Sequence, residues 1–203
     1  MEKVIIVWKI YKLGDTEVCA TKNVNVAIKK GEHVAILGPS GSGKSTMMNL
    51  VGALDVPTKG SIFLDGKDIG KMSESQLAQL RGKTIGFVFQ QFNLIPSLTA
   101  TQNVELPMMF YGVAASERLK RAHALLRVAI ARALANEPDV ILADEPTGNL
   151  DSTTGKSIML MLGELHAKGK TIIMVTHDVD LVKHAQRVIE LKDGQVVKDK
   201  RVK

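Results

Sequence analysis

Two hydrophobic patterns alternate along the chain. Short runs of aliphatic and β-branched residues are typical of strands, and runs without polar alternation are typical of strands buried on both faces. Such runs lie at 3–8, 24–29, 33–37, 60–65, 85–89, 140–143, 171–175, 188–191 and 195–198. Apolar residues at helical spacing lie at 46–54, 73–81, 101–110, 116–126, 127–135 and 157–168. The alternation predicts an α/β protein with a mixed sheet and helices on both of its faces.

Turn signals between some of the strands predict a second, smaller sheet. The dipeptide Gly14-Asp15 separates the first two runs, and Asp65-Gly66 closes the run at 60–65. Strands joined by turns without an intervening helix are typical of antiparallel sheets. We therefore predict a small antiparallel sheet that lies against the main one.

One loop between a predicted strand and a predicted helix carries a phosphate-binding pattern. Residues 38–46 read GPSGSGKST and match G-x-x-x-x-G-K-[ST], known as Walker A. Glycines let backbone N–H groups turn toward phosphate oxygens, and the helix N-terminus adds its positive end. We predict that Lys44 reaches the β- and γ-phosphates of a nucleotide and that Ser45 binds Mg²⁺. An ordinary glycine-rich turn is the alternative, and the strand–loop–helix context argues against it. The predicted nucleotide-binding residues are Gly38, Ser40, Gly41, Ser42, Gly43, Lys44, Ser45 and Thr46.

A second strand ends in two acidic residues. The run at 140–143 (VILA) is followed by Asp144 and Glu145, a pattern known as Walker B. Adjacent strand residues point to opposite faces, so Asp144 can hold a Mg²⁺ ion while Glu145 faces an attacking water molecule. Phosphoryl transfer needs both tasks. A solvated strand end is the alternative, which the phosphate loop upstream makes the weaker reading.

Three more residues are candidates on position alone. Gln90 follows the run at 85–89, and His177 follows the run at 171–175. Because ligands bind at the carboxyl ends of strands in open α/β sheets, Gln90 could coordinate Mg²⁺ or hold a water molecule, and His177 could donate to a γ-phosphate. Tyr11 could stack on an adenine. The spacing leaves open the alternatives that Gln90 is a plain strand-exit glutamine and that Tyr11 is a core or edge-strand tyrosine.

Composition narrows the class of protein. The 203 residues are 45% hydrophobic, which suits one domain over 1–203. The net charge of +6 comes from scattered residues and aromatic residues make up 4%, so we expect no nucleic-acid partner. A single Cys19 excludes a disulfide framework and suits a reducing compartment. No run approaches the ~20 apolar residues of a membrane-spanning helix, so any membrane role must come through a partner.

Together these segments resemble the nucleotide-binding subunit of an ATP-binding-cassette (ABC) transporter over nearly the whole chain. The resemblance rests on GPSGSGKST, on the strand that ends in Gln90, on LADEPTGNLD and on VTHD. The segments GALDVPTKG, IGFVFQQFNLIPSLTATQNVELPM and RVAIARALANEPDVILADEPTGNLD are similar to the lipoprotein-release, macrolide-export and cell-division ATPases, the LolD, MacB and FtsE types. The sequence does not identify the transported substrate or choose among these three roles.

The resemblance implies a fold and a function. The expected fold is a RecA-like P-loop NTPase core with a small antiparallel β-subdomain and an α-helical subdomain at about 92–135. The expected function is an ATP-binding and ATP-hydrolysing subunit. Two copies would enclose ATP and Mg²⁺ between them and so drive an integral membrane permease subunit. The subunit would be cytoplasmic and peripheral on the inner face of the cell membrane.

The resemblance also implies roles for single residues. Tyr11 becomes the adenine-stacking residue, and Gln90 becomes the glutamine that links ATP to the membrane partner. Glu145 becomes the catalytic base, Asp151 part of the D-loop, and His177 the switch histidine. The segment 92–98 would lie near the groove that receives a helix of the membrane subunit.

One family motif has no counterpart in the sequence. The family carries an L-S-G-G-Q signature before the R-V-A-I-A-R-A-L helix, whereas here Leu126 is followed directly by Arg127. A helix end, a loop and the signature would need roughly 20–25 residues. Either this segment belongs to the protein and is missing from the printed sequence, or it is deleted and the chain binds ATP without competent turnover. The junction contains no turn residue, which favours the first explanation.

Two other functions stay open from the sequence. A soluble ABC ATPase that acts on nucleic acid or ribosomes would be expected to have two cassettes or a long inserted coiled coil, and this chain has neither. A non-hydrolysing ATP binder becomes the better interpretation if the signature is truly deleted.

Overall fold

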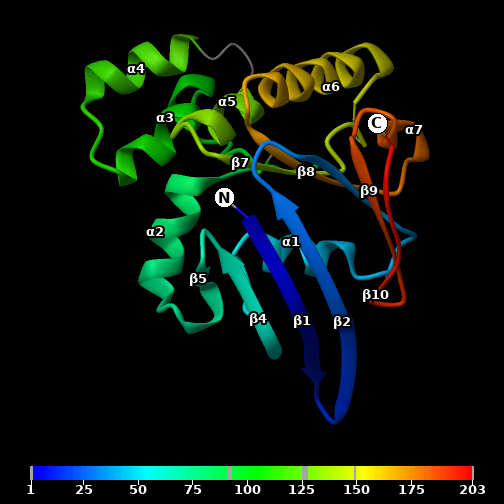
Figure 1. Cartoon of the computed structure of the whole chain (residues 1–203). Helices are drawn as coiled ribbons and strands as arrows, with labels where there is room; N and C mark the ends of the chain where they lie inside the picture. Colours follow the sequence, from blue (N-terminus) through cyan, green and yellow to red (C-terminus); the bar gives the residue numbers. More distant parts are fainter. Residues whose placement is uncertain (1, 91–92, 125–127, 149, 203) are drawn as a thin grey trace.

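The computed structural model describes residues 2–90, 93–124, 128–148 and 150–202 and contains two sheets (Figure 1). The larger sheet has six strands in the order β10-β9-β3-β8-β7-β6. Its strands are β3 (His33–Leu37), β6 (Ile85–Val88), β7 (Val140–Asp144), β8 (Thr171–Thr176), β9 (Arg187–Lys192) and β10 (Gln195–Arg201). All neighbours in it pair in parallel except β9 and β10, which form an antiparallel hairpin. The predicted mixed sheet is thus confirmed.

The register of the parallel strands brings their carboxyl ends to one edge. Leu37 at the end of β3 pairs with Thr176 at the end of β8. Asp144 at the end of β7 pairs with Val175, and Val88 at the end of β6 pairs with Ala143. The residues that follow β3, β8, β7 and β6 therefore begin at the same level of the sheet.

Alternate residues of the central strands pack into two different cores. Val34 and Ile36 of β3 belong to one core, and Ala35 belongs to the other. The first core contains α1 (Lys44–Val51) and the inner side of the small sheet, whereas the second contains α5 (Val128–Leu134), α6 (Ser152–Ala167) and α7 (Val179–Val182). Period-two alternation with both faces apolar is what a sheet covered on both sides requires.

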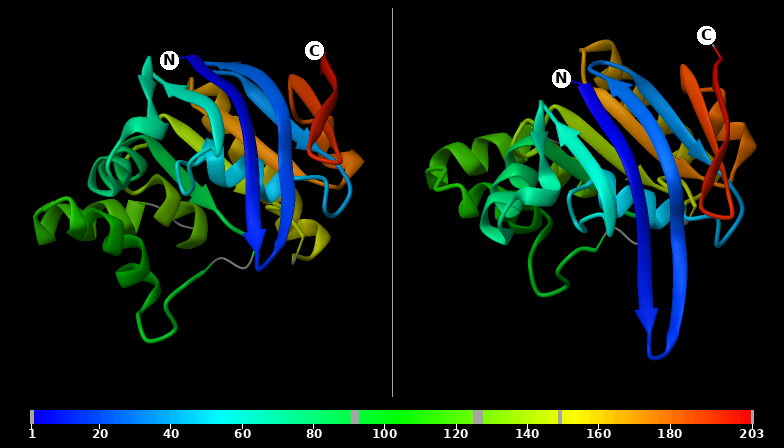
Figure 2. Two further views of the ribbon diagram at one scale, coloured as in Figure 1. Left: turned by 90° about the horizontal axis from the view of Figure 1, so that it is seen from below. Right: turned by 60° about the horizontal axis from the view of Figure 1, so that its bottom comes forward.

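The smaller sheet is antiparallel, in the order β2-β1-β4-β5. Its strands are β1 (Glu2–Leu13), β2 (Thr16–Lys29), β4 (Lys59–Leu64) and β5 (Lys67–Asp68), followed by a short 3-10 helix η1 (Ile69–Lys71). The β1–β2 hairpin is longer than the runs at 3–8 and 24–29 predict, and its tip projects beyond the rest of the molecule (Figure 2). Backbone pairing of β1 with β2 continues through residues 9–13, opposite residues 16–21 of β2, of which 16–19 are exposed.

Helices α2 to α5 lie together at one end of the molecule (Figure 1). They are α2 (Glu74–Thr84), α3 (Ala100–Phe110), α4 (Ala115–Ala124) and α5. Ser73 and Gln76, three residues apart, predict a capping box, and the structure confirms it. The junction at Leu126 and Arg127 lies outside the described residues. Gly86 lets α5 approach β6 closely, because a methyl group at Gly86 would lie 2.3 Å from the Ala133 carbonyl oxygen of α5.

Two further observations qualify the sequence-based expectations. The helix after the phosphate loop ends at Val51 rather than at Leu54, which is 45% exposed. Gly52 ends it and packs so closely on Phe87 that a methyl group there would lie 2.7 Å from the ring.

Among the described residues, no helix combines the length and the hydrophobicity needed to cross a membrane.

Candidate nucleotide-binding site

Four predicted elements of the site lie at one edge of the large sheet. The loop 38–46 follows β3, and Asp144 and Glu145 end β7. His177 follows β8, and Gln90 lies two residues beyond β6. Since β3, β8, β7 and β6 are neighbours in that order and run parallel, these residues share one edge, which we call the strand-end edge. Edges of this kind are where open α/β sheets bind ligands.

The loop 38–46 curls back on its own backbone. The Ser42 N–H donates to the Pro39 carbonyl oxygen at 3.2 Å, and the Lys44 ammonium donates to the same oxygen at 2.8 Å. The N-cap of α1 is Gly43, in the left-handed region with φ 96°. The Met47 N–H makes the helical bond to the Gly43 carbonyl oxygen, at 2.8 Å. The N–H groups of residues 43–46 thus precede the intrahelical bonds of α1 and form a positive N-terminus suited to phosphate.

Neighbouring segments approach this loop so closely that glycine is required at two positions. A methyl group at Gly43 would lie 2.4 Å from the Ala20 carbonyl oxygen of β2. A methyl group at Gly38 would lie 2.4 Å from the Leu191 carbonyl oxygen of β9. The Ser42 hydroxyl is buried in the loop without a hydrogen-bond partner among the described residues. Buried polar groups usually have partners, and a phosphate in the loop fits this unpaired hydroxyl.

The β9–β10 hairpin also supports the loop 38–46 through a backbone hydrogen bond. The Gly194 N–H, in the turn of the hairpin, donates to the Ser42 carbonyl oxygen at 3.1 Å. The Gly194 carbonyl oxygen accepts from the Lys22 N–H of β2 at 2.7 Å. This contact is not visible in the sequence, because the hairpin lies some 150 residues after the loop.

Asp144 interacts electrostatically with Glu145 and with the lysine of the loop. Partial burial raises the pKa of Asp144, and the adjacent Glu145 raises it further, whereas Lys44 lowers it. A carboxylate in such a position is stabilised by an added cation. No group of three or more His, Cys, Asp or Glu side chains in the described part of the chain could hold a metal. Mg²⁺ is commonly bound by one or two carboxylates together with substrate phosphates, and Asp144 with the Ser45 hydroxyl fits that kind of site.

Glu145 is held at each of its polar groups. Its backbone is in the left-handed region, with φ 43°, which is uncommon for a residue with a side chain. Its N–H donates to the Val175 carbonyl oxygen at 2.9 Å. Its Oε1 accepts from the His177 backbone N–H at 2.9 Å and lies 2.6 Å from His177 Nδ1. Its Oε2 accepts from the Thr176 hydroxyl at 3.0 Å. Sequence reasoning missed Thr176, although the VTHD motif contains it.

Gln90 contacts the segment after Glu145, and Asp151 lies where that segment leads into α6. A methyl group at Gly148 would lie 2.9 Å from Gln90 Nε2, so the glutamine side chain packs against this segment. Asp151 is the N-cap of α6 and accepts from two backbone N–H groups, each at 3.0 Å. Hydrogen bonds from Thr154 and Thr153 lower the pKa of Asp151. Gln90 is thus close to the strand-end edge, and its role there stays a prediction.

Tyr11 lies on β1 and is linked to the start of α1. Its hydroxyl donates to Asp55 Oδ2 at 2.9 Å and also interacts with Thr46. Partial burial raises the pKa of Tyr11, and Asp55 raises it further. The Lys9 ammonium lies 5.0 Å from the centroid of the tyrosine ring. The structure therefore places the ring beside the last residue of the phosphate loop, where stacking on a base stays a prediction.

Asp144→Asn is expected to stabilise the nucleotide-free protein at neutral pH. Because the pKa of Asp144 is raised, the folded chain holds a proton there over a pH range in which the unfolded chain has lost it, so stability falls as pH rises through that range. Asparagine has no charge to bury. The melting temperature of the Asp144→Asn variant should therefore exceed that of the wild type by a few degrees at neutral pH and by less near pH ~4. Thermal melts at both pH values test this, with Asp15→Asn in an exposed turn as control. A lower melting temperature of Asp144→Asn at neutral pH would contradict it.

Comparisons with known proteins agree on one family. A family model described as ABC transporter matches residues 21–127, about half of the chain. The uncharacterized ABC transporter ATP-binding protein MJ0796 of Methanocaldococcus jannaschii is 46% identical over 230 residues, which cover 100% of this chain and 98% of that protein. The macrolide export ATP-binding/permease protein MacB of Shewanella sp. (strain ANA-3) is 45% identical over 95% of this chain and 33% of MacB.

Solved structures give the same result. A dimeric structure of a post-hydrolysis state of the ATP-binding cassette MJ0796, bound to ADP and Pi, matches with a TM-score of 0.94 and covers 100% of this chain and 99% of that chain. The structure of cbiO1 from Clostridium perfringens, part of the ABC transporter complex cbiONQ, matches with a TM-score of 0.85 at 33% identity. It covers 98% of this chain and 88% of that chain.

Proposed function

Because the chain belongs to the ATP-binding subunits of ABC transporters, which are ATPases, we propose that it binds ATP with Mg²⁺ at the strand-end edge and thereby powers an integral membrane permease. One observation carries the proposal: the phosphate loop, the Asp144–Glu145 pair and His177 meet at this edge. The chain forms one cassette over 1–203, with a helical part at about 92–135. It acts on the cytoplasmic side of the membrane, and nucleic acid is not its partner.

Each group at the edge has a separate task in hydrolysis. Lys44 and the N–H groups at the start of α1 bind the β- and γ-phosphates, and Tyr11 stacks on the adenine. Glu145 orients a water molecule and takes its proton while the water oxygen bonds to the γ-phosphorus and the bond to the β-phosphate oxygen breaks. His177 donates to the γ-phosphate. Ser45, Asp144 and Gln90 would hold Mg²⁺, which would supply positive charge next to the phosphate oxygens.

A second copy of the chain completes the assembly. Two cassettes enclose ATP between them, and their closure and opening move the permease. The dimeric MJ0796 structure with ADP and Pi supports this arrangement, because it has the same fold at 46% identity. The family signature would cover the γ-phosphate from the opposite copy.

The missing signature is best explained by an internal segment of the protein, between Leu126 and Arg127, that the given sequence lacks. The alignment with MJ0796 extends over 230 residues, whereas this chain has 203, and the family match ends at residue 127, where the motif would be expected. Both observations support a gap at this junction, which lies outside the described residues. An intact mass well above 22.0 kDa would establish the segment, and a mass of 22.0 kDa would favour a non-hydrolysing ATP binder.

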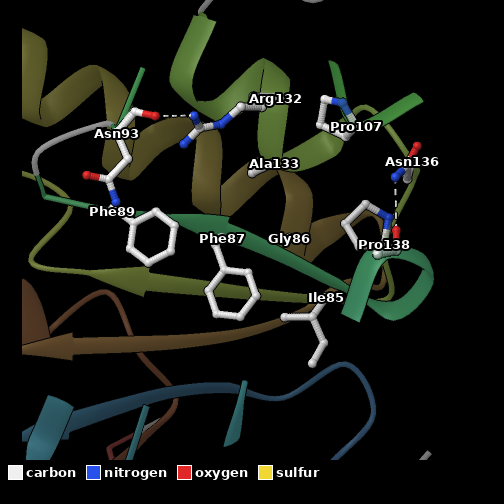
Figure 3. Close-up of a pocket in the computed structure, with 11 residues that line it drawn as sticks. Ile85, Gly86, Phe87, Phe89, Asn93, Pro107, Arg132, Ala133, Asn136 and Pro138 are labelled. Carbon is white, nitrogen blue, oxygen red and sulfur yellow. Dashed lines mark hydrogen bonds between the residues drawn. The ribbon is translucent and has the colours of Figure 1, made fainter. Parts of the chain in front are cut away.

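An apolar groove beside the helices is suited to a permease helix. A cavity of about 590 Å³ lies between α2, α3 and β6, and its lining includes Leu54, Leu106 and Phe110. Phe110 is 80% exposed, which is unusual for so large an apolar side chain. A neighbouring cavity of about 320 Å³ shares Ile85 with it and extends the groove toward Phe89. Figure 3 shows the residues that line this smaller cavity.

Contacts at the end of the groove connect it with Gln90. Asn93 accepts at its carbonyl oxygen from Arg132 of α5 at 2.6 Å, and both residues line the smaller cavity (Figure 3). Because β6 leads from the groove to Gln90 and from there to Asn93, a helix seated in the groove contacts the segment that carries the glutamine. We propose that the permease senses the nucleotide through this segment.

Purification from native membranes tests the permease partner. The tagged protein should co-purify with an integral membrane protein and hydrolyse ATP in the presence of Mg²⁺. Phe110→Glu should lose the membrane protein and keep ATP binding, because a charge in the groove opposes the burial of an apolar helix. Leu160→Glu, at a residue on α6 that is 69% exposed and lies outside the groove, is the matched control and should keep the partner. Co-purification with RNA or DNA and no membrane protein would favour a soluble ABC ATPase instead.

A further inference from the structure

The end of β8 contains a buried hydroxyl group with two partners. Thr176 is 0% exposed, and its hydroxyl donates to Glu145 Oε2 at 3.0 Å. The Thr176 hydroxyl oxygen in turn accepts from the Asp178 N–H at 3.0 Å. We propose that Thr176 is a positioning residue that fixes the Glu145 carboxylate for attack of water on ATP. This inference rests on the proposed function, since it assigns Glu145 its catalytic role.

The direction of these hydrogen bonds follows from the chemistry of the groups. A backbone N–H can only donate, so the Thr176 oxygen accepts from Asp178. The single hydroxyl proton is then directed to the carboxylate, which can only accept while it is ionised. Asp178 is the N-cap of α7, so its backbone position is itself fixed by the helix that follows. The hydroxyl therefore has one defined orientation, toward Glu145.

Both oxygens of the carboxylate are held by groups of one segment. Oε2 accepts from the Thr176 hydroxyl, and Oε1 accepts from the His177 N–H at 2.9 Å. The Glu145 N–H is bonded to the Val175 carbonyl oxygen of β8. Donors on both oxygens fix the plane of the carboxylate. The hydrogen bond of the Glu145 N–H fixes the backbone from which the side chain extends. Without the hydroxyl, only the two contacts of His177 with Oε1 remain, and Oε2 is no longer held.

A positioning role predicts a specific kinetic effect. Valine has nearly the same shape as threonine and cannot donate. Thr176→Val should lower kcat about 10- to 100-fold, because a misplaced catalytic group loses the benefit of orientation. KM for ATP and the affinity for nucleotide should stay within about twofold, because Thr176 is assigned no contact with the phosphates. Thr176→Ser keeps the hydroxyl and should retain kcat within a few-fold of the wild type.

The same strand offers a matched control. Thr171, at the other end of β8, is 3% exposed, and its hydroxyl accepts from the Gly31 N–H at 2.9 Å. Thr171→Val thus removes a buried hydroxyl and the partner of a backbone N–H, as Thr176→Val does, but at a position five residues, or about 17 Å, along β8 from Thr176. It should lower the melting temperature by a similar amount and leave kcat unchanged.

The experiment is steady-state phosphate release by the full-length protein, with nucleotide titrations and thermal melts of each variant. Normal kcat in Thr176→Val, or an equal loss in Thr171→Val, would overturn the positioning role. If the valine variant does not fold, Thr176→Ala replaces it, and a serine variant as slow as the alanine variant would also overturn it. Normal hydrolysis in Glu145→Gln would refute the catalytic role of Glu145 and with it this inference. No hydrolysis by the wild type would overturn the proposed function itself.

Discussion

Glu145→Gln is expected to bind ATP with near wild-type affinity and to hydrolyse it at least about 100-fold more slowly. Removal of a general base commonly lowers a rate by ~10²–10⁴. Glutamine keeps the size of the side chain and can still accept from the Thr176 hydroxyl or the His177 N–H, but it cannot take a proton from water. ATP therefore stays intact in the site, and the ATP-bound dimer should accumulate. Phosphate release and size-exclusion chromatography with MgATP measure the two effects.

A surface variant controls for the loss of one negative charge. Glu164 lies exposed on α6. Glu164→Gln should hydrolyse ATP at the wild-type rate and show no extra dimer. Normal steady-state hydrolysis in Glu145→Gln would refute the assigned role of Glu145 and leave the nucleotide-binding proposal to be judged on its own tests.

Lys44→Ala is expected to weaken ATP binding about 10- to 100-fold. A hydrogen bond to a charged group is worth ~1.5–3 kcal/mol, and the lysine is assigned to two phosphates. The substitution also removes the ammonium bond to the Pro39 carbonyl oxygen, so the loop loses one of its internal contacts. Isothermal titration with ATP and Mg²⁺ measures the change, and hydrolysis at subsaturating ATP should fall at least as much.

Another lysine serves as the control for this experiment. Lys168 follows α6 and is exposed. Lys168→Ala also lowers the net charge by one unit and should leave the affinity unchanged. An unaltered affinity in Lys44→Ala would mean that the loop 38–46 does not hold the phosphates.

The strand ends of the site could be predicted from sequence because a pattern of a few consecutive residues specifies each of them. The run at 140–143 and the two acids after it specify a buried strand that stops at the edge of a sheet. The phosphate loop is equally local, since Gly43 and Lys44 act through the backbone around them. Their convergence follows once the strands are taken as parallel neighbours, which the alternation of strands and helices predicts.

Other parts of the site depend on contacts between distant segments. The Thr176 hydroxyl is significant only because Glu145, 31 residues earlier, lies opposite it. The close approach of Ala20 to Gly43 requires the β1–β2 hairpin to lie over the loop, and nothing in the spacing of either segment encodes this. The hairpin itself extends past its apolar runs because backbone hydrogen bonds do not depend on hydrophobic side chains. Hydrophobic patterns, which depend on burial, therefore underestimate the length of such strands.

The braced phosphate loop has a consequence for biosynthesis. Both neighbours of β3, namely β8 and β9, are made after it, and Gly194, whose N–H donates to the Ser42 carbonyl oxygen, is made later still. During synthesis, β3 therefore has no partner strand until β8 has emerged from the ribosome. The loop 38–46 gains its bond from Gly194 only after the turn between β9 and β10 has followed.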